Sequence, residues 1–329
     1  MQAPCLRPLL AAVVALGSAG IGCADLVGAD FDVHPACETC AVVVADGVDH
    51  PKSVAVTDGW LFWVESLESG RVMKMPLEGG PPVLIASGEP SPNQIAAGGG
   101  YVYWTNTTSD ATGGVRRVKA SGGDVEDVAK GRVAALGVAV DDTHVYWTEQ
   151  GTQSVRSLAF GDIPGEGAVL ADSLDQPSLV TVNDKYIAFT AIGATGGLYT
   201  YSKNGSEGGK VADAPGANAV TLLDSVVCWT TFFAGTSKED VSCVGFDGEG
   251  RMEIAGERDE PTGLVSDGTR LYWGELGAGA IFQAEPYGAP KKIAEGQSGP
   301  NGLTLDGDTL YWANYTSSGS LVKLKIPQL

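Results

Sequence analysis

Carboxylates and amides recur in the chain at two fixed distances from a repeated aromatic residue. The repeated residue, called the anchor below, is Trp63, Trp104, Trp147, Phe189, Trp229, Trp273 and Trp312. Eleven residues before the anchors stand Lys52, Asn93, Leu136, Ser178, Asn218, Thr262 and Asn301. Two residues after the anchors stand Glu65, Asn106, Glu149, Ala191, Thr231, Glu275 and Asn314. Carboxylate and amide oxygens are ligands of Ca²⁺, and the same groups form hydrogen bonds with sugars and peptides.

These polar residues have two interpretations. In the first they form a ring that binds a ligand, and we expect its members to be Lys52, Asn93, Asn218, Asn301, Glu65, Glu149 and Glu275. In the second they are structural and tie neighbouring repeats together through bonds from side chain to backbone. No catalytic residue is predicted, because none of the three histidines, His34, His50 and His144, is matched with a nucleophile.

The spacing of the anchors identifies the elements that would position these residues. Successive anchors lie 39 to 44 residues apart, and a period near 40 indicates repeated supersecondary units. Apolar residues stand two and nine positions before every anchor, with turns such as Asp58-Gly59 and Asp267-Gly268 between them. This pattern predicts two strands joined in a β-hairpin. Two further alternating runs follow in each unit, as in 72–75 and 83–86.

Seven such units predict an all-β fold, a seven-bladed β-propeller of four-stranded antiparallel blades over residues 41–329. The last unit ends after its third strand, and the run 42–45 resembles a fourth strand. We therefore expect this N-terminal strand to close the ring and to cover the exposed strand edges. In such a blade the first strand starts and the second strand ends at one rim. Both polar sets are therefore expected at one mouth of the central channel.

The tetrapeptides around four anchors resemble the Tyr-Trp-Thr-Asp repeats of lipoprotein-receptor propellers. They are Tyr103-Trp104-Thr105-Asn106, Tyr146-Trp147-Thr148-Glu149, Tyr272-Trp273-Gly274-Glu275 and Tyr311-Trp312-Ala313-Asn314, and the run 300–306 also matches the family. The chain differs from that family in its seven blades and in lacking the aspartate of the tetrapeptide. The resemblance implies a structural role for the position of that aspartate. Related propellers are binding scaffolds or lactone-hydrolysing enzymes, so the fold leaves the function open.

The composition excludes two kinds of partner. The chain has 21 Lys and Arg against 40 Asp and Glu, a net charge of −19. Binding of nucleic acid needs a basic surface, and so does electrostatic attraction to anionic lipid. We expect no nucleic-acid partner, and contact with a membrane only through a lipid anchor.

Residues 1–22 have the features of an export signal. Arg7 precedes the apolar run 9–16, which is far shorter than the about 20 residues that a transmembrane helix needs. The segment Gly20-Ile21-Gly22-Cys23 resembles the lipobox of bacterial lipoproteins, although glycine replaces the usual leucine. The resemblance implies lipidation at Cys23, a tether over 23–40 and, from Ala24, the outer membrane. Cleavage nearby without lipid, in the periplasm or at the cell surface, is the alternative.

The cysteines agree with export, where disulfides form. Loss of Cys5 with the signal leaves Cys23, Cys37, Cys40, Cys228 and Cys243. We expect one disulfide between Cys37 and Cys40 and a second between Cys228 and Cys243, on consecutive predicted strands. Cys23 is then left for the lipid. A C-x-x-C pair also occurs in redox and zinc sites, but no second such pair is present.

The sequence therefore predicts a monomeric, non-enzymatic binding or scaffold module of the bacterial cell envelope. Its expected ligand is a protein, peptide or glycan at the propeller rim, and it needs no cofactor. The alternative is a Ca²⁺-dependent enzyme of lactone-hydrolase type. Its metal would be held at the channel mouth by a subset of Glu65, Asn93, Glu149, Asn218, Glu275 and Asn301, and a metal-activated water would be the nucleophile.

Overall fold

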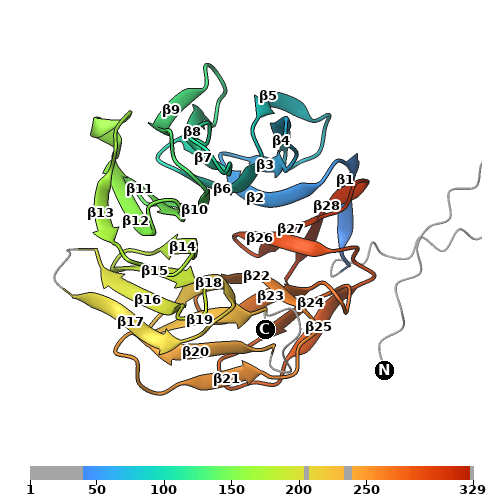
Figure 1. The fold of residues 1–329 in the computed structure, drawn as a ribbon. Coiled ribbons are helices and arrows are strands. Elements are labelled where there is room, and N and C mark those ends of the chain that lie inside the picture. Colours follow the sequence, from blue (N-terminus) through green and yellow to red (C-terminus); the bar gives the residue numbers. More distant parts are fainter. Residues whose placement is uncertain (1–39, 204–206, 233–238, 327–329) are drawn as a thin grey trace, which may run out of the picture.

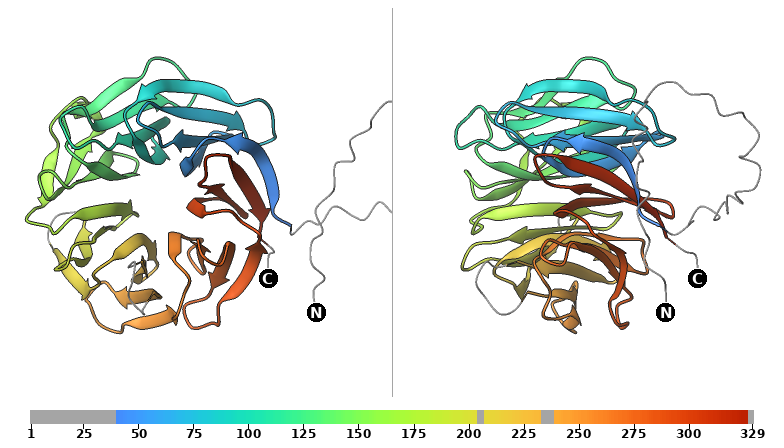
Figure 2. Two further views of the ribbon diagram at one scale, coloured as in Figure 1. Left: turned by 45° about the vertical axis from the view of Figure 1, so that its right-hand side comes forward. Right: turned by 90° about the vertical axis from the view of Figure 1, so that its right-hand side faces the viewer.

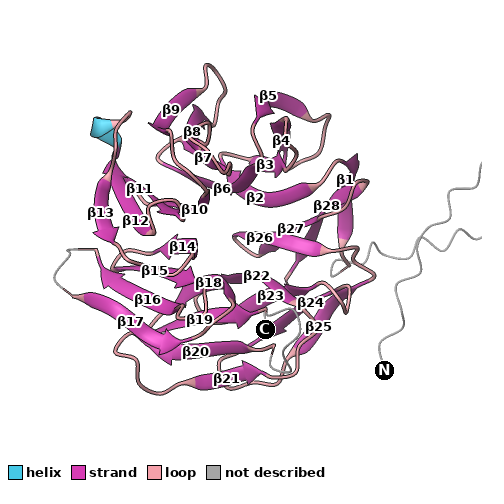
Figure 3. Ribbon diagram, viewed as in Figure 1, coloured by secondary structure: helices cyan, strands magenta, loops and turns pink. Residues whose placement is uncertain are grey.

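The computed structural model describes residues 40–203, 207–232 and 239–326. Their strands form seven four-stranded antiparallel sheets arranged in a ring (Figure 1). The one helix in this part of the chain is a short 3-10 turn, Phe160–Asp162 (Figure 3). The predicted all-β, seven-bladed propeller is confirmed, and Figure 2 shows the same ring from two further directions.

Each blade is built from strands in chain order, starting at the centre of the ring. Blade one has β2 (Pro51–Thr57), β3 (Trp60–Glu65), β4 (Gly70–Pro76) and β5 (Val83–Glu89). Blade two has β6 (Pro92–Gly98), β7 (Tyr101–Asn106), β8 (Gly114–Lys119) and β9 (Glu126–Lys130). Blade three has β10 (Ala135–Val140), β11 (His144–Glu149), β12 (Ser154–Ala159) and β13 (Ala168–Ala171). Blade four has β14 (Pro177–Val182), β15 (Tyr186–Ala191), β16 (Gly197–Ser202) and β17 (Gly208–Asp213).

The remaining blades follow the same order. Blade five has β18 (Ala217–Leu223), β19 (Val226–Thr231), β20 (Val241–Gly245) and β21 (Met252–Ala255). Blade six has β22 (Pro261–Ser266), β23 (Leu271–Glu275), β24 (Ala280–Ala284) and β25 (Lys291–Glu295). In blade seven, β26 (Pro300–Asp306), β27 (Thr309–Asn314) and β28 (Gly319–Lys325) lie beside β1 (Val42–Val48). Strand β1 pairs antiparallel with β28, with Val43 opposite Val322.

The anchors form the core of the ring because each lies in the second strand of its blade. All seven are at most 1% exposed. They pack in clusters that join neighbouring blades, as Trp104 of β7 does with Phe62 and Val64 of β3. Phe189 fills the position of the missing tryptophan and stacks on Tyr199 and Tyr201. Each four-stranded blade therefore buries one large aromatic side chain, and the length of one blade gives the period near 40.

Every blade starts with a residue in the left-handed backbone region, thirteen positions before its anchor. These residues are His50, Ser91, Ala134, Gln176, Gly216, Glu260 and Gly299, with φ between 47° and 78°. The carbonyl of each accepts a hydrogen bond from the N–H group three residues after the anchor, as Ser91 does from Thr107 at 3.0 Å. This bond holds the start of the first strand beside the end of the second. Both polar sets are therefore positioned at one rim.

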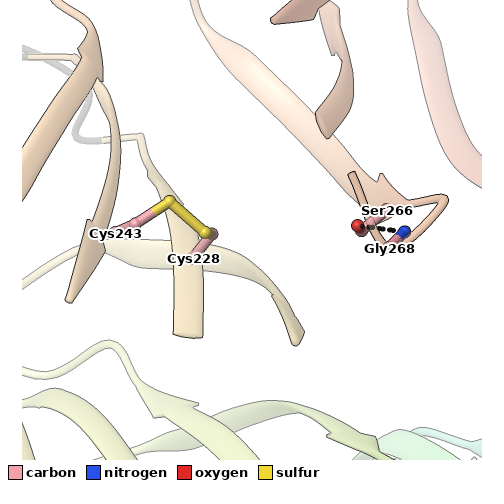
Figure 4. Close-up of a disulfide and its surroundings, with 4 residues drawn as sticks. All are labelled: Cys228, Cys243, Ser266 and Gly268. Carbon is pink, nitrogen blue, oxygen red and sulfur yellow. Dashed lines mark hydrogen bonds between the residues drawn. A yellow bond between two sulfur atoms is a disulfide. The ribbon is translucent and has the colours of Figure 1, made fainter. Parts of the chain in front are cut away.

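The predicted disulfide between Cys228 and Cys243 is present and buried (Figure 4). The two cysteines stand opposite each other on β19 and β20. Cys40 is also disulfide-bonded. The signal segment, Cys23, His34 and Cys37 lie outside the described residues, so lipidation and the pairing of Cys37 with Cys40 stay predictions. Within the described residues, no helix is long and apolar enough to cross a membrane.

Candidate functional site

A central channel of about 680 Å³ is lined by the first strand of every blade. Each of these strands contacts the next one around the ring, and β26 contacts β2. The strands run in the same direction and in register, so residues at equal distance from the anchors form rings around the channel. The volume lies within the range of about 300–1,000 Å³ that is typical of ligand sites.

One mouth of the channel is formed by the residues eleven positions before the anchors. Six of the seven line the channel, namely Lys52, Asn93, Leu136, Ser178, Asn218 and Asn301. The seventh, Thr262, instead donates a hydrogen bond to the Pro300 carbonyl of the next blade at 2.7 Å. The other end of the first strands contributes apolar residues such as Val56, Val140 and Leu305. The channel is therefore polar at one mouth and apolar toward the other.

The three asparagines of this mouth differ in how much of their hydrogen-bonding capacity is used. Asn93 Nδ2 donates to the Leu136 carbonyl at 3.0 Å, which joins blades two and three. Asn301 Oδ1 accepts from the backbone N–H of its neighbour Gly302 at 2.8 Å, and this leaves its amide N–H groups unused. The Asn218 side chain has no hydrogen bond within the described part of the chain. Asn218 and Asn301 thus present donors to the channel.

Lys52 is the only ionisable residue among those that line the channel. Within the described ranges its ammonium group has neither an ion pair nor a hydrogen bond. Burial lowers the pKa of Lys52 below that of an ordinary lysine, because protein atoms replace much of its water. The side chain is only half-buried by accessible area, since it faces the open space of the channel. The mouth therefore carries one positive charge without a partner.

The three predicted carboxylates lie elsewhere, buried and paired with arginines. Glu65, Glu149 and Glu275 are 3%, 2% and 1% exposed, and none of them lines the channel. Glu65 accepts from Arg71 Nε at 2.6 Å. Arg156 Nε lies 3.3 Å from Glu149 Oε2. The structure therefore separates the predicted set into a channel group of Lys52 and three asparagines and a buried group of three glutamates.

Sequence reasoning missed a third set of polar residues, which stands fifteen residues before the anchors. This set supplies arginines near Glu149 and Glu275, whereas the partner of Glu65 lies on β4. Arg132 and Arg258 occupy this position in blades three and six, and Glu89 and Gln297 precede blades two and seven. Glu89 is 1% exposed and accepts from Trp104 Nε1 at 2.9 Å and from Asn106 Nδ2 at 2.6 Å. Polar residues recur at this third fixed distance from the anchors, and this recurrence could have identified them in the sequence.

These positions do not fit a Ca²⁺ ion at the channel mouth. Calcium takes 6–8 oxygen ligands, among them carboxylates. The carboxylates of the predicted set are paired with arginines outside the channel, and the ammonium group of Lys52 would repel a cation at the mouth. No group of three or more His, Cys, Asp or Glu side chains among the described residues is arranged to hold a metal.

His50 forms a pair that the sequence reasoning did not identify. Its Nδ1 atom lies 2.6 Å from Asp49 Oδ1, and its ring packs edge-on against Tyr315 with centroids 5.5 Å apart. A histidine oriented by a carboxylate is one part of a hydrolytic site. No hydroxyl or thiol within the described residues forms a hydrogen bond with the ring, and His50 does not line the channel.

Comparison with known proteins gives a likeness of fold. No family model matches the chain, and neither does any curated protein. Among solved structures, a virginiamycin B lyase from Staphylococcus aureus is 15% identical, with a TM-score of 0.67 over 86% of this chain and 98% of that one. A gluconolactonase from Xanthomonas campestris is 14% identical, with a TM-score of 0.56 over 87% and 89%. A chain of the nidogen/laminin complex is 17% identical, with a TM-score of 0.53 over 69% and 89%.

Proposed function

We propose that the chain is a binding module of the cell envelope that takes its ligand at the polar mouth of the channel. The ligand is a protein, a peptide or a glycan, and the propeller acts as a rigid scaffold for it. Membership in the Tyr-Trp-Thr-Asp propeller family is part of this proposal. So is export, with a lipid at Cys23 that anchors a monomeric propeller to the outer membrane.

The observation that carries the proposal is the contrast between the two polar sets. The channel mouth keeps unused hydrogen-bond donors on Asn218 and Asn301, whereas the buried glutamates are neutralised by arginines. A small number of placed polar groups in a concave site is the usual arrangement for ligand recognition. Acid–base chemistry needs ionisable groups within reach of the ligand, and Lys52 is the one such group among the residues that line the channel.

The similar structures support a binding role without deciding it. One belongs to the nidogen/laminin complex, in which proteins assemble, and two carry the names of enzymes. One fold therefore serves both kinds of function, and the choice rests on the site. The lactone-hydrolase alternative is not favoured, because the carboxylates expected to hold its metal are paired with arginines.

The test is capture from envelope extract and from peptide and glycan arrays, with the double variant Asn218→Ala/Asn301→Ala as the comparison. We expect the variant to bind the partner captured by the wild type with at least about tenfold lower affinity. Its melting temperature should be unchanged. A matched control is Glu68→Ala, an exposed residue in the loop after β3 on the same face. Equal capture by all three proteins would exclude the channel mouth as the site.

A second measurement tests the enzymatic alternative directly. Ca²⁺ that binds the native state raises its melting temperature by mass action. We expect no difference between Ca²⁺ and EDTA, and no turnover of a lactone panel. Intact-mass analysis of purified protein tests the anchor, since a diacylglycerol adduct on a chain starting at Cys23 is expected. A lipid-free chain starting elsewhere would contradict the anchor alone.

A further inference from the structure

Lys52 is an unpaired cation in an otherwise uncharged channel, within a chain of net charge −19. Other lysines in partly enclosed positions are partnered. Lys74 donates to the Ala120 carbonyl at 2.9 Å, and Lys203 lies 2.6 Å from Asp141 Oδ2. A charge that is taken out of water without a partner destabilises the folded state. The unpaired charge of Lys52 is therefore unfavourable in the folded state, and a bound anion would supply the missing partner.

The strands on both sides of β2 place amides beside this lysine. Asn301 on β26 and Asn93 on β6 stand at the position that Lys52 occupies on β2. The residues eleven before the anchors form one ring around the channel, so both asparagines lie level with Lys52. Close backbone packing fixes this alignment, since a Cβ on Gly302 would clash with the Lys52 carbonyl oxygen. Asn93 Nδ2 uses one of its two hydrogens on Leu136, and the other remains. Lys52 thus has an asparagine at the same position on each of the two neighbouring blades.

The charge of the site selects the class of anion. One lysine balances a single negative charge, so a monoanion leaves the channel neutral. A dianionic phosphate would leave one charge uncompensated in a partly dry site and would be opposed by the negative field of the whole chain. A carboxylate offers two oxygens, which can accept from the ammonium group and from an amide together.

We propose that the polar mouth binds a carboxylate group, with its charge on Lys52 and hydrogen bonds from Asn301 and Asn93. This inference rests on the proposed binding function and names the chemistry that the site recognises. The group belongs either to the C-terminus of a protein or peptide, as in the proposed function, or to a small organic acid, which that function does not include. The rest of the molecule that carries the carboxylate extends into the channel or out over the rim.

The experiment uses the full mature chain, sodium propionate as the probe and sodium chloride at equal ionic strength as the reference. The variants are Lys52→Met and the control Lys119→Met, which removes an exposed lysine on β8. We expect propionate to raise the melting temperature of the wild type and the control above the chloride value, but not that of Lys52→Met. Calorimetric titration should show at least about tenfold weaker binding to Lys52→Met.

In chloride alone, Lys52→Met should melt at or above the wild-type temperature, because a partly desolvated, unpaired charge is removed. Melting well below the wild type would show that Lys52 holds the structure and would overturn the proposal. So would an equal propionate effect in all three proteins, no effect in the wild type, or tighter binding of inorganic phosphate than of propionate.

Two peptides distinguish the sources of the carboxylate. Trialanine with a free C-terminus should bind the wild type, and trialanine amide should not. Tighter binding of trialanine than of propionate supports a peptide C-terminus, and equal or weaker binding supports a small acid. If propionate fails while Asn218→Ala/Asn301→Ala still loses its captured partner, this inference fails and the proposed function stands.

Discussion

Arg258 Nε lies 2.5 Å from Glu275 Oε1, although the two residues are seventeen positions apart in the chain. Arg258 precedes β22, and Glu275 ends β23 of the same blade. The same carboxylate oxygen accepts from Trp273 Nε1 at 2.9 Å. The pair thus joins the connection between blades, the end of a strand and the anchor tryptophan in one buried group.

The same two positions are also paired in blade seven, but with different residue types. In blade seven, Gln297 and Asn314 occupy the two positions, and Gln297 Oε1 accepts from both Trp312 Nε1 and Asn314 Nδ2, at 3.0 and 3.1 Å. The acceptor for the indole therefore moves from the end of the second strand to the preceding connection. The position two after the anchor is a structural position in these blades, but its bonds run from side chain to side chain rather than from side chain to backbone.

This exchange leads to a stability prediction. Glu275→Gln should lower the free energy of unfolding by about 3 kcal/mol, because Arg258 is left mostly buried without a counter-charge. The double variant Arg258→Gln/Glu275→Asn copies the pair of blade seven and should recover more than half of that loss. Urea unfolding measures both. If the double variant is as unstable as the sum of its single changes, the two positions are not coupled.

The fold could be predicted because its determinants are local and repeated. Each blade has its own anchor, hairpin and turn, so Phe189 could be placed by its spacing although it is not tryptophan. The site was harder to predict because the two polar columns look alike in the sequence. The start of β2 faces the channel at Lys52, whereas Glu65 at the end of β3 turns toward Arg71. That difference depends on side-chain pairing between strands and connections.

Part of the site could still have been found from the sequence. In several blades the residues fifteen before and two after the anchors are complementary: Arg132 with Glu149, Glu89 with Asn106, and apolar Leu174 with Ala191. When the residue types at these two positions change together from one repeat to the next, the two positions are expected to be in contact. The unpaired state of Lys52 could not have been inferred in this way, because it depends on what surrounds the channel.

Asp267 gives a prediction for the dependence of stability on pH. Burial raises the pKa of this carboxyl, but hydrogen bonds from the Tyr272 hydroxyl and from the N–H groups of Thr269 and Arg270 outweigh it, so its pKa lies well below the usual value. A lowered folded pKa stabilises the fold above the unfolded pKa of about 3.9, and the contribution is lost as the pH falls through the folded value. Asp267→Asn should therefore cost about 1 kcal/mol at pH 7, after allowance for solvent screening.

The difference between Asp267→Asn and the wild type should shrink steadily between about pH 4 and pH 2. Chemical denaturation at a series of pH values measures it. Asp259→Asn is a control, because this exposed aspartate in the connection before β22 has no side-chain hydrogen bond or ion pair within the described residues. A difference that stays constant over this range would show that the hydrogen bonds of Asp267 do not depend on its charge.

The disulfide between Cys228 and Cys243 closes a loop whose ends are 15 residues apart. A cross-link of this length stabilises a fold by about 3 kcal/mol in the chain-entropy estimate. Cys228→Ala/Cys243→Ala should therefore unfold at lower urea concentration, with the cavity left by two buried sulfurs adding to the loss. Reductant should destabilise the wild type more than the variant, which keeps the disulfide of Cys40. Free thiols at both positions in non-reducing peptide mapping would contradict the pairing.

The contribution of β1 to the ring is the last prediction. A chain that begins at His50 lacks this strand, so the backbone groups of β28 that pair with it become an open edge. It also loses the contacts of Val48, which is 7% exposed and packs with Trp63 and Leu321. We expect the melting temperature to fall by about 10 °C or more relative to a chain that begins at Ala41 and keeps β1. Hydrogen exchange should show the loss first in β28, whose N–H groups then lie at the edge. Equal melting of the two chains would show that the ring is held by the contact of β26 with β2 and does not depend on β1.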